Sequence, residues 1–210
     1  MTFGLVKHNN NSISAITSAG QLAQGKMTLI KEQTASSSSS ISFVDGSSSV
    51  VLDSTYPIYL FKFINIHPAT DNTEFQFNGS DDDSSHSYDV TKTTTFFRAY
   101  HDEGDSFALL EYRPNADQAQ GTALQPLNYA DSVGTDNDMC FVGTLHLFDP
   151  SNTTFVKHFI STCNSASQNP MPTNTFIAGY FNTTSAITGI RFQQNTGNID
   201  IGTIKMYGVS

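Results

Sequence analysis

The sequence predicts an all-β protein, an antiparallel β-sandwich that is jelly-roll-like in topology and carries an N-terminal extended arm; a closed barrel or another sandwich topology is the alternative. Apolar and polar residues alternate over many short segments, which is the period of a half-buried strand. Turn-forming residues separate these segments, and no long segment has the period of a helix. Only 14% of residues are charged and 11% are aromatic, a composition that suits strands better than helices.

The length of the chain indicates one domain. It has 210 residues, which is enough for a sizeable core, and sandwiches of this length are commonly single domains. We expect residues 26–210 to form the β-sandwich. Residues 1–25 are polar and small, with Ile13, Ile16 and Leu22 spaced for one helical turn or an extended arm. Because this segment cannot close a core alone, we interpret it as an arm or anchoring segment.

The first half of the sequence contains five strand-like segments. The most apolar, 56–66, is rich in aromatic and β-branched residues and is expected to be a central strand covered on both faces, with Pro57 at its start. A long acidic loop follows the fourth segment, and region 101–138 is expected to hold only short pieces of regular structure. The other expected strands are 26–34, 41–44, 73–78 and 90–100.

The clearest local prediction is a hairpin. Segments 139–148 and 153–162 flank Asp149-Pro-Ser-Asn, in which proline presets φ and the Asp and Asn side chains cap the backbone. The expected pairs are Phe148 with Thr153, Leu145 with Val156, and Gly143 with His158. This register gives one buried face, formed by Phe141, Leu145, Leu147, Val156 and Ile160.

The same register separates two histidines. His146 and His158 fall on opposite faces of the hairpin, which argues against a shared metal site. His158 lies opposite a glycine that leaves room for its ring. We therefore interpret His158 as a packed core imidazole.

The chain ends in a strongly alternating segment, 197–208, although chain termini usually fray unless they are paired. Ile199 and Ile201 share one parity, whereas Ile204 and Met206 share the other. A β-bulge near Gly202 would let both apolar pairs face one core. We expect a central or paired last strand, preceded by strands over 175–182 and 186–193.

Charge and composition exclude several classes of protein. The net charge of −9 and the ten scattered Lys and Arg residues argue against a nucleic-acid partner. No segment is long and apolar enough for a membrane span, and the first residues lack the apolar part of a secretory signal. We therefore expect synthesis in a cytoplasm. Cys140 and Cys163 fit that setting as two half-buried thiols, although a disulfide between them is geometrically allowed.

An acidic loop offers the first candidate site. Residues 80–89 concentrate oxygen ligands of the kind that Ca²⁺ binds in flexible loops. They lack the spacing of an EF-hand loop, and a solvated loop tip between strands is the favoured interpretation. The candidate calcium ligands are Asp81, Asp82, Asp83 and Asp89.

A second cluster, His101-Asp-Glu-Gly-Asp, could ligate a metal or act in acid–base catalysis. Consecutive strand residues point to opposite faces, so His101 and Asp102 cannot share a site unless the segment turns. Gly104 favours a polar turn, and Asp136 and Asp138 are interpreted in the same way. The sequence has none of the common nucleophile, zinc-protease or phosphate-loop motifs. We expect no enzyme activity and no cofactor.

Several phrases resemble a known family: "MTLIKEQTASSSSSISFVDG", "YPIYLFKFINIHPATDNTEFQFNGS", "TTTFFRAYHDEGDS", "GTLHLFDPSNTTFVKHFIS", "AGYFNTTSAITGIRFQ" and "GNIDIGTIKMYGV". Together they are similar to virion structural proteins of aquatic tailed phages, almost continuously over residues 26–210. The resemblance implies a particle component that is made in the host cytoplasm and located in the virion. It supplies no catalytic residue.

From this resemblance and the composition we expect a non-enzymatic decoration or cement protein of the capsid surface. Its partners would be the major capsid protein or neck and tail components, and a homo-oligomer, such as a trimer, is expected. The alternative is an adhesin module of the tail that recognises a host glycan through loops 79–89 and 101–138. A third hypothesis is a carbohydrate-active enzyme that uses Asp102 or Glu103.

Overall fold

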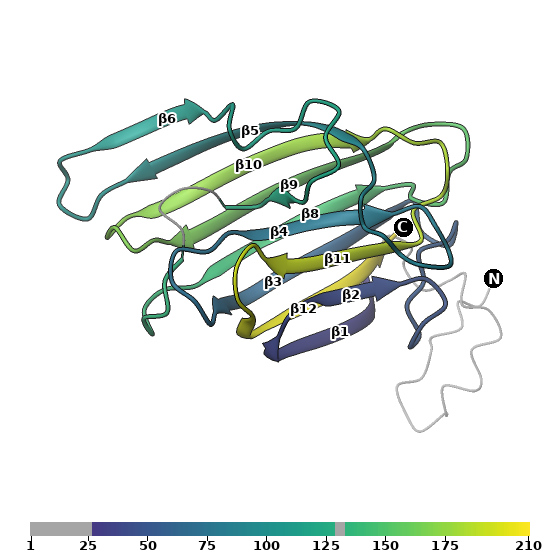
Figure 1. Ribbon diagram of the computed structural model, residues 1–210, viewed down its shortest axis with the longest axis horizontal. Helices are drawn as coiled ribbons and strands as arrows, with labels where there is room; N and C mark the ends of the chain where they lie inside the picture. The colour runs from purple at the N-terminus through teal and green to yellow at the C-terminus, as the bar shows by residue number, and fades with distance from the viewer. Residues whose placement is uncertain (1–26, 129–132) are drawn as a thin grey trace, which may run out of the picture.

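Two antiparallel sheets stack face to face in the computed structural model, which describes residues 27–128 and 133–210 (Figure 1). The expected all-β sandwich is confirmed, and the described residues contain strands but no helix. Accordingly, this part of the chain has no helix that could cross a membrane. The expected arm over residues 1–25 lies outside the described residues.

Sheet A has eight strands in the order β1-β12-β3-β8-β9-β10-β5-β6, and sheet B has four in the order β2-β11-β4-β7. The described residues between β5 and β8 contribute only two short strands, as expected for the segment 101–138. The strands are β1 (Met27–Ser38), β2 (Ile41–Val44), β3 (Ile58–Pro68), β4 (Phe75–Ser80), β5 (Lys92–His101), β6 (Ala108–Tyr112), β7 (Gln125–Pro126), β8 (Phe141–Phe148), β9 (Lys157–Ala166), β10 (Pro172–Phe181), β11 (Gly189–Gln194) and β12 (Ile199–Val209).

Eight of these strands form a jelly roll. They pair as a nested series: β4 with β7, β3 with β8, β2 with β11, and β1 with β12. This nesting is what results when one long hairpin rolls up, and it divides the eight strands into the sheets β1-β12-β3-β8 and β2-β11-β4-β7. The jelly-roll expectation is thus confirmed by the strand order.

The other four strands enlarge sheet A on one side. β9, β10, β5 and β6 continue the sheet beyond β8, and Figure 1 shows β5 and β6 extending past the strands of sheet B. Part of the inner face of β5 is covered by the chain between β6 and β7 instead. There the Thr94 hydroxyl donates to Gln125 Oε1 (2.7 Å) and accepts from the Gln118 amide (2.8 Å).

The core between the sheets is built from phenylalanines. Phe192, in the middle of sheet B, has its ring centroid 5.1 Å from that of Phe63 and 5.3 Å from that of Phe61, both in sheet A. Within its own sheet it lies 5.9 Å from Phe75 and 6.2 Å from Phe77. All five side chains are buried. Phe192 therefore joins the two sheets at the centre of the sandwich.

The expected β8–β9 hairpin exists, but its predicted register is wrong. Asn152 donates its amide to the Asp149 carbonyl (3.1 Å) as expected, yet its side chain then accepts from Thr154 and Phe155 and delays the second strand until Lys157. The observed pairs include Gly143 with Cys163, Leu145 with Ser161, and Leu147 with Phe159.

This shift in register is odd-numbered, so it exchanges the faces of β9. Ile160 is 50% exposed and His158 is exposed, while Phe159 and Cys163 are buried. The interpretation of His158 as a core imidazole is therefore wrong. His146 and His158 both lie on the outer face of sheet A rather than on opposite faces.

The C-terminal strand β12 lies between β1 and β3, so the expectation of a paired last strand is confirmed. The β12–β3 register shifts on both sides of Ile201, with an extra residue first in β12 and then in β3. Gly202 has φ of +135°. Ile199, Ile204 and Met206 are buried, but Ile201 is 56% exposed, so the expectation that both apolar pairs face the core is wrong.

Two lysines are buried at one end of the sandwich. Lys92 and Lys157 both pair with Phe181, one from each side of β10, and both are 0% exposed. The Lys92 ammonium donates to the Val90 carbonyl (3.3 Å) and the Lys157 ammonium to the Thr183 carbonyl (3.2 Å). Burial lowers the pKa of Lys92 to about 7, and the charge of Asp89 opposes this shift only in part.

We expect Phe192→Ala to lower the free energy of unfolding by about 3–5 kcal/mol, because it leaves a cavity between the sheets. Denaturant-induced unfolding followed by fluorescence or circular dichroism measures the change. Phe155→Ala, at a side chain that is 68% exposed, serves as the control and should change the value by less than about 0.5 kcal/mol. Equal effects of the two variants would contradict the central role of Phe192.

Gly202→Val should destabilise the protein. A Cβ at this position would lie 2.8 Å from the Asn65 carbonyl oxygen and 2.8 Å from Ile66 Cα, and a β-branched residue does not tolerate this φ. Thermal unfolding should show a lower Tm, whereas the neighbouring Thr203→Val should leave it nearly unchanged. A Tm of Gly202→Val equal to that of the unchanged protein would show that the irregularity does not require glycine.

The buried Lys92 predicts a pH dependence of stability. The unfolded chain binds this proton more tightly than the folded protein does, so stability should rise between about pH 7 and pH 9, by at most about 1.4 kcal/mol per pH unit. Lys92→Met should remove this part of the slope and increase stability at pH 7, as measured by urea unfolding at several pH values. Lys31→Met, on the edge strand β1, should retain the slope; its loss there too would implicate another group.

Candidate interaction surface

The acidic loop before β5 is organised around one carboxylate. Asp82 accepts hydrogen bonds from the backbone amides of Ser85 (2.7 Å), His86 (2.7 Å) and Ser87 (3.0 Å), and from the Ser80 hydroxyl (3.0 Å). The three backbone amides hold the pKa of Asp82 far below its ordinary value, the Ser87 amide contributing most. The negative charge of Asp82 is thus used to close the loop on itself.

Asp89 lies near Asp82, since the Ser87 hydroxyl is within hydrogen-bond distance of both carboxylates, but the four candidate calcium ligands do not form one group. Asp81 accepts from the Thr183 hydroxyl (2.8 Å), and Asp89 accepts from the Ser87 hydroxyl. Within residues 27–128 and 133–210, no three His, Cys, Asp or Glu side chains are grouped so that they could hold a metal ion. Calcium binding at Asp81, Asp82, Asp83 and Asp89 stays a prediction, and the hydrogen bonds of Asp82 give the loop a structural explanation.

The segment His101–Asp105 forms the turn between β5 and β6, as its glycine indicated. Asp102 accepts from the Ser106 hydroxyl (2.6 Å) and from the Ser106 and Phe107 amides, which lower the pKa of its carboxyl group. His101 Nε2 lies 3.1 Å from Asp105 Oδ1 in a solvent-exposed contact. Both oxygens of Asp102 are thus engaged in closing the turn.

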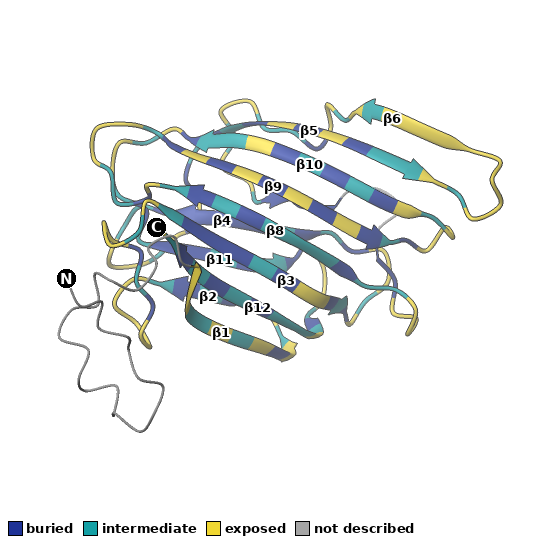
Figure 2. Ribbon diagram, turned by 180° about the vertical axis from the view of Figure 1, so that it is seen from behind, coloured by how far each residue is buried: buried dark blue, intermediate teal, exposed yellow. Residues whose placement is uncertain are grey.

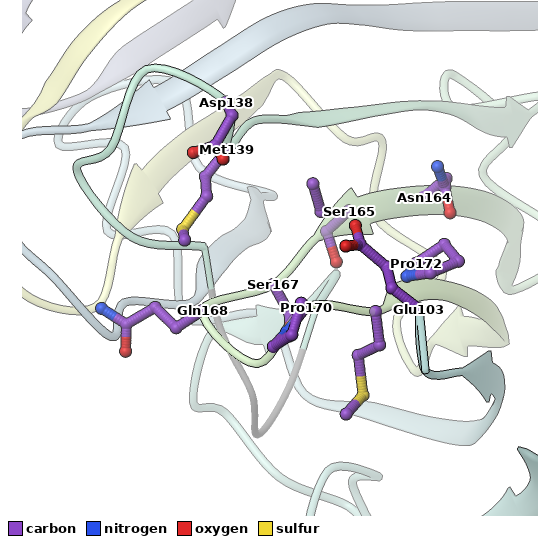
Figure 3. Close-up of a pocket in the computed structure, with 11 residues that line it drawn as sticks. Glu103, Asp138, Met139, Asn164, Ser165, Ser167, Gln168, Pro170 and Pro172 are labelled. Carbon is purple, nitrogen blue, oxygen red and sulfur yellow. The ribbon is translucent and has the colours of Figure 1, made fainter. Parts of the chain in front are cut away.

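A cavity of about 240 Å³ with a mixed polar and apolar lining lies at this end of the sandwich (Figure 3). It is formed where the β5–β6 turn meets the β9–β10 connection, and the Glu103 amide donates to the Pro170 carbonyl (2.9 Å). Glu103, Asp138, Asn164 and Gln168 line it, whereas Asp102 and Asp136 do not. Of the acidic residues considered in the sequence, only Glu103 and Asp138 meet in one cavity.

The outer face of sheet A carries an unusual surface, which we call the neutral face. It consists of the outward-pointing residues of β8, β9, β10, β5 and β6, strands that are described throughout. None of them is Asp, Glu, Lys or Arg, although the chain has a net charge of −9. The residues are Val142, Thr144, His146, Phe148, His158, Ile160, Thr162, Asn164, Ala166, Pro172, Asn174, Phe176, Ala178, Tyr180, Thr93, Thr95, Phe97, Ala99, His101, Ala108, Leu110 and Tyr112.

Cross-strand neighbours make the neutral face continuous. One row crosses four strands through His146, Ile160, Ala178 and Thr95. The next row includes the stacked rings of Phe176 and Phe97, whose centroids are 4.9 Å apart. Figure 2 shows this side of sheet A, with exposed positions alternating with buried ones along β9. The sheet pleat thus presents one uncharged layer outward.

Two adjoining hollows lie on this face. The first, about 400 Å³, lies over Ala178 and is bordered by Ile160, His158 and Tyr180. The second, about 540 Å³, is lined by Phe148 and Phe155 and shares His158 with the first. Both are lined mainly by apolar atoms, and the small side chain of Ala178 makes room for the first one. The face therefore offers concave apolar relief to a partner.

Charged side chains return on the strands beyond β8, at the other side of sheet A. On the outer face of β1, β12 and β3, Glu32 pairs with Lys205 (2.9 Å), and the Lys62 ammonium lies 5.5 Å from the centre of the Tyr207 ring. The remaining acidic residues lie mostly in loops. The neutral face is therefore confined to β8 and the four strands beyond it.

The two cysteines are free thiols, so no disulfide links them. Cys163 is buried on the inner face of β9 beneath Gly143, and Cys140 is partly buried. Burial raises the pKa of the Cys163 thiol to about 12. Cys163 therefore acts as a packing residue, more deeply buried than the sequence suggested.

The neutral face was not predicted from the sequence, because its signal is the absence of charged residues at every second position of strands that are separate in the sequence. Its five strands are brought together only by the sheet order. The comparisons with known proteins add no relative: no family model, no curated protein and no solved structure matches the chain.

Proposed function

We propose that this chain is a non-enzymatic structural protein of a tailed-phage virion, a decoration or cement protein that binds the capsid surface through its neutral face. The observation that carries the proposal is the uncharged, aromatic outer face of β8, β9, β10, β5 and β6 on an otherwise acidic protein. The cores of protein–protein interfaces are depleted in charged residues and enriched in aromatic ones. The family resemblance of residues 26–210 supplies the virion setting.

The chemistry of the neutral face suits a particle component. Binding through Phe176, Phe97 and Ile160 would depend little on salt, because it involves no exposed ion pair. The acidic loops at the ends of the strands would face solvent and keep particles apart. The expected partners are the major capsid protein or other proteins of the particle.

A second candidate function is an adhesin module of the tail. The cavity lined by Glu103, Asp138, Asn164 and Gln168 has the carboxylates and amides that bind sugar hydroxyls, which favours a glycan ligand there. Of the expected loops 79–89 and 101–138, the 101–107 part lies at the opposite end of the ten-residue strand β5 from loop 79–89, so these two segments cannot form one site together. In this form the glycan would be bound by Glu103, Asp138 and the β9–β10 connection.

Binding of the purified protein to phage particles that lack it would test the proposal. Ile160→Lys places a charge at the centre of the neutral face and should weaken binding by about tenfold or more. Thr34→Lys, which adds the same charge at an exposed position of β1, should bind normally. Many copies per particle, rather than the few of a tail component, would also support the capsid proposal.

Two results would overturn the capsid proposal. One is equal binding of Ile160→Lys and Thr34→Lys to particles, with both variants folded. The other is a copy number per virion as small as the number of subunits in one ring of a tail. Binding to host cells that is lost in Glu103→Gln but kept in Ile160→Lys would support the adhesin.

A further inference from the structure

The strand β6 is an unprotected edge of sheet A. It pairs with β5 on one side, and no strand from residues 27–128 or 133–210 pairs with its other side. The Asp102 amide donates to the Phe107 carbonyl (3.0 Å) and the Arg113 amide to the Phe96 carbonyl (2.9 Å), so odd-numbered residues of β6 bond to β5. The amides and carbonyls of Ala108, Leu110 and Tyr112 consequently point away from β5.

Apolar side chains flank this edge on both faces. Leu110 is 68% exposed and Tyr112 is 50% exposed on the outer face, and Leu109 is 41% exposed on the inner face. Exposed apolar strands with free backbone groups are templates for pairing with another strand. In Figure 2 β6 is drawn almost entirely in the colour of exposed residues.

The other sheet edges carry protective features. β1 has an irregular register between Leu29 and Lys31 and bears the charged Lys31 and Glu32. β2 has four residues, and β7 has two, one of them Pro126. Short strands, proline, bulges and charges all prevent edge pairing. β6 is also short, with five residues, but it has no proline and no bulge, and its one charged residue, Glu111, is paired to Arg98 (2.8 Å).

We propose that β6 pairs antiparallel with β6 of a second copy of this chain, about a two-fold axis at Leu110. The outward residues 108, 110 and 112 would then form the hydrogen-bonded pairs of the new ladder, with Leu110 facing Leu110 of the second copy. Both sheets A would join into one continuous sheet. The inference does not depend on the proposed function.

The residues of β6 fit this symmetric register. Ala108 would face Tyr112 of the second copy, which sets the smallest side chain against the largest on both sides of the axis. On the inner face, Leu109 would pack on the aliphatic part of Glu111 of the second copy. Within each copy the carboxylate of Glu111 is already paired with Arg98 and with Arg113 (3.3 Å). Because the strand matches itself in size and charge, a second copy is the occupant that it fits.

The contact is short, so pairing is expected to be concentration-dependent. A five-residue edge buries less surface than a standard stable interface. Copies held side by side on a particle would pair more completely, because their effective concentration is high. The neutral faces of the two copies would also become continuous.

Sedimentation of the full chain over a range of concentrations tests the inference. The unchanged protein should shift from monomer toward dimer as its concentration rises. Leu110→Lys sets two like charges opposite each other and should weaken dimerisation by about tenfold or more. Ile160→Lys, equally folded by circular dichroism, should dimerise normally and distinguish this contact at β6 from the centre of the neutral face.

A cross-link locates the axis. Leu110→Cys, with Cys140 changed to Ser, should form a disulfide-linked dimer on mild oxidation, because Cα atoms of such a pair lie about 5.5 Å apart. Ile160→Cys in the same background should not cross-link. A protein that stays monomeric at every concentration, a dimer that persists in Leu110→Lys, or no cross-link at position 110 would each overturn the inference.

Discussion

The packing of Phe192 against phenylalanines of both sheets is the constraint on which the rest of the structure depends. Phe61 and Phe63 come from sheet A, and Phe75 and Phe77 from sheet B, so one side chain sets the spacing of the two layers. With this core in place, sheet A can extend beyond sheet B. Part of the inner face of this extension is covered by the chain between β6 and β7, which is held there by polar contacts such as that of Thr94 with Gln125.

Strand positions were largely predictable because alternation is a local property. The most apolar segment became the central strand β3, and the terminal segment became the paired strand β12. The register of the β8–β9 hairpin was not predictable from the shortest turn. The side chain of Asn152 accepts from two further amides, and the resulting longer connection inverts the faces of β9. Ile201 was misplaced because two offset bulges surround it rather than one.

The candidate surface was less predictable than the fold. Local sequence drew attention to acidic clusters, yet Asp82 and Asp102 use their oxygens to close turns. The neutral face combines β6 and β5 with β8, β9 and β10, which are distant in sequence. Each strand has uncharged residues at its outward positions, as in the series His158, Ile160, Thr162 and Asn164. Only the sheet order shows that these positions lie side by side.

Both added hairpins lie on the same side of the jelly roll, with β9–β10 next to β8 and β5–β6 next to β10. Their outward side chains lie on the face of sheet A opposite to Phe192. Substitutions at these outward positions can therefore accumulate without loss of the fold. Related chains whose binding partner changes could thus diversify at this side of the sheet. The strands β1, β2, β11 and β12 would stay constrained by their packing in the core.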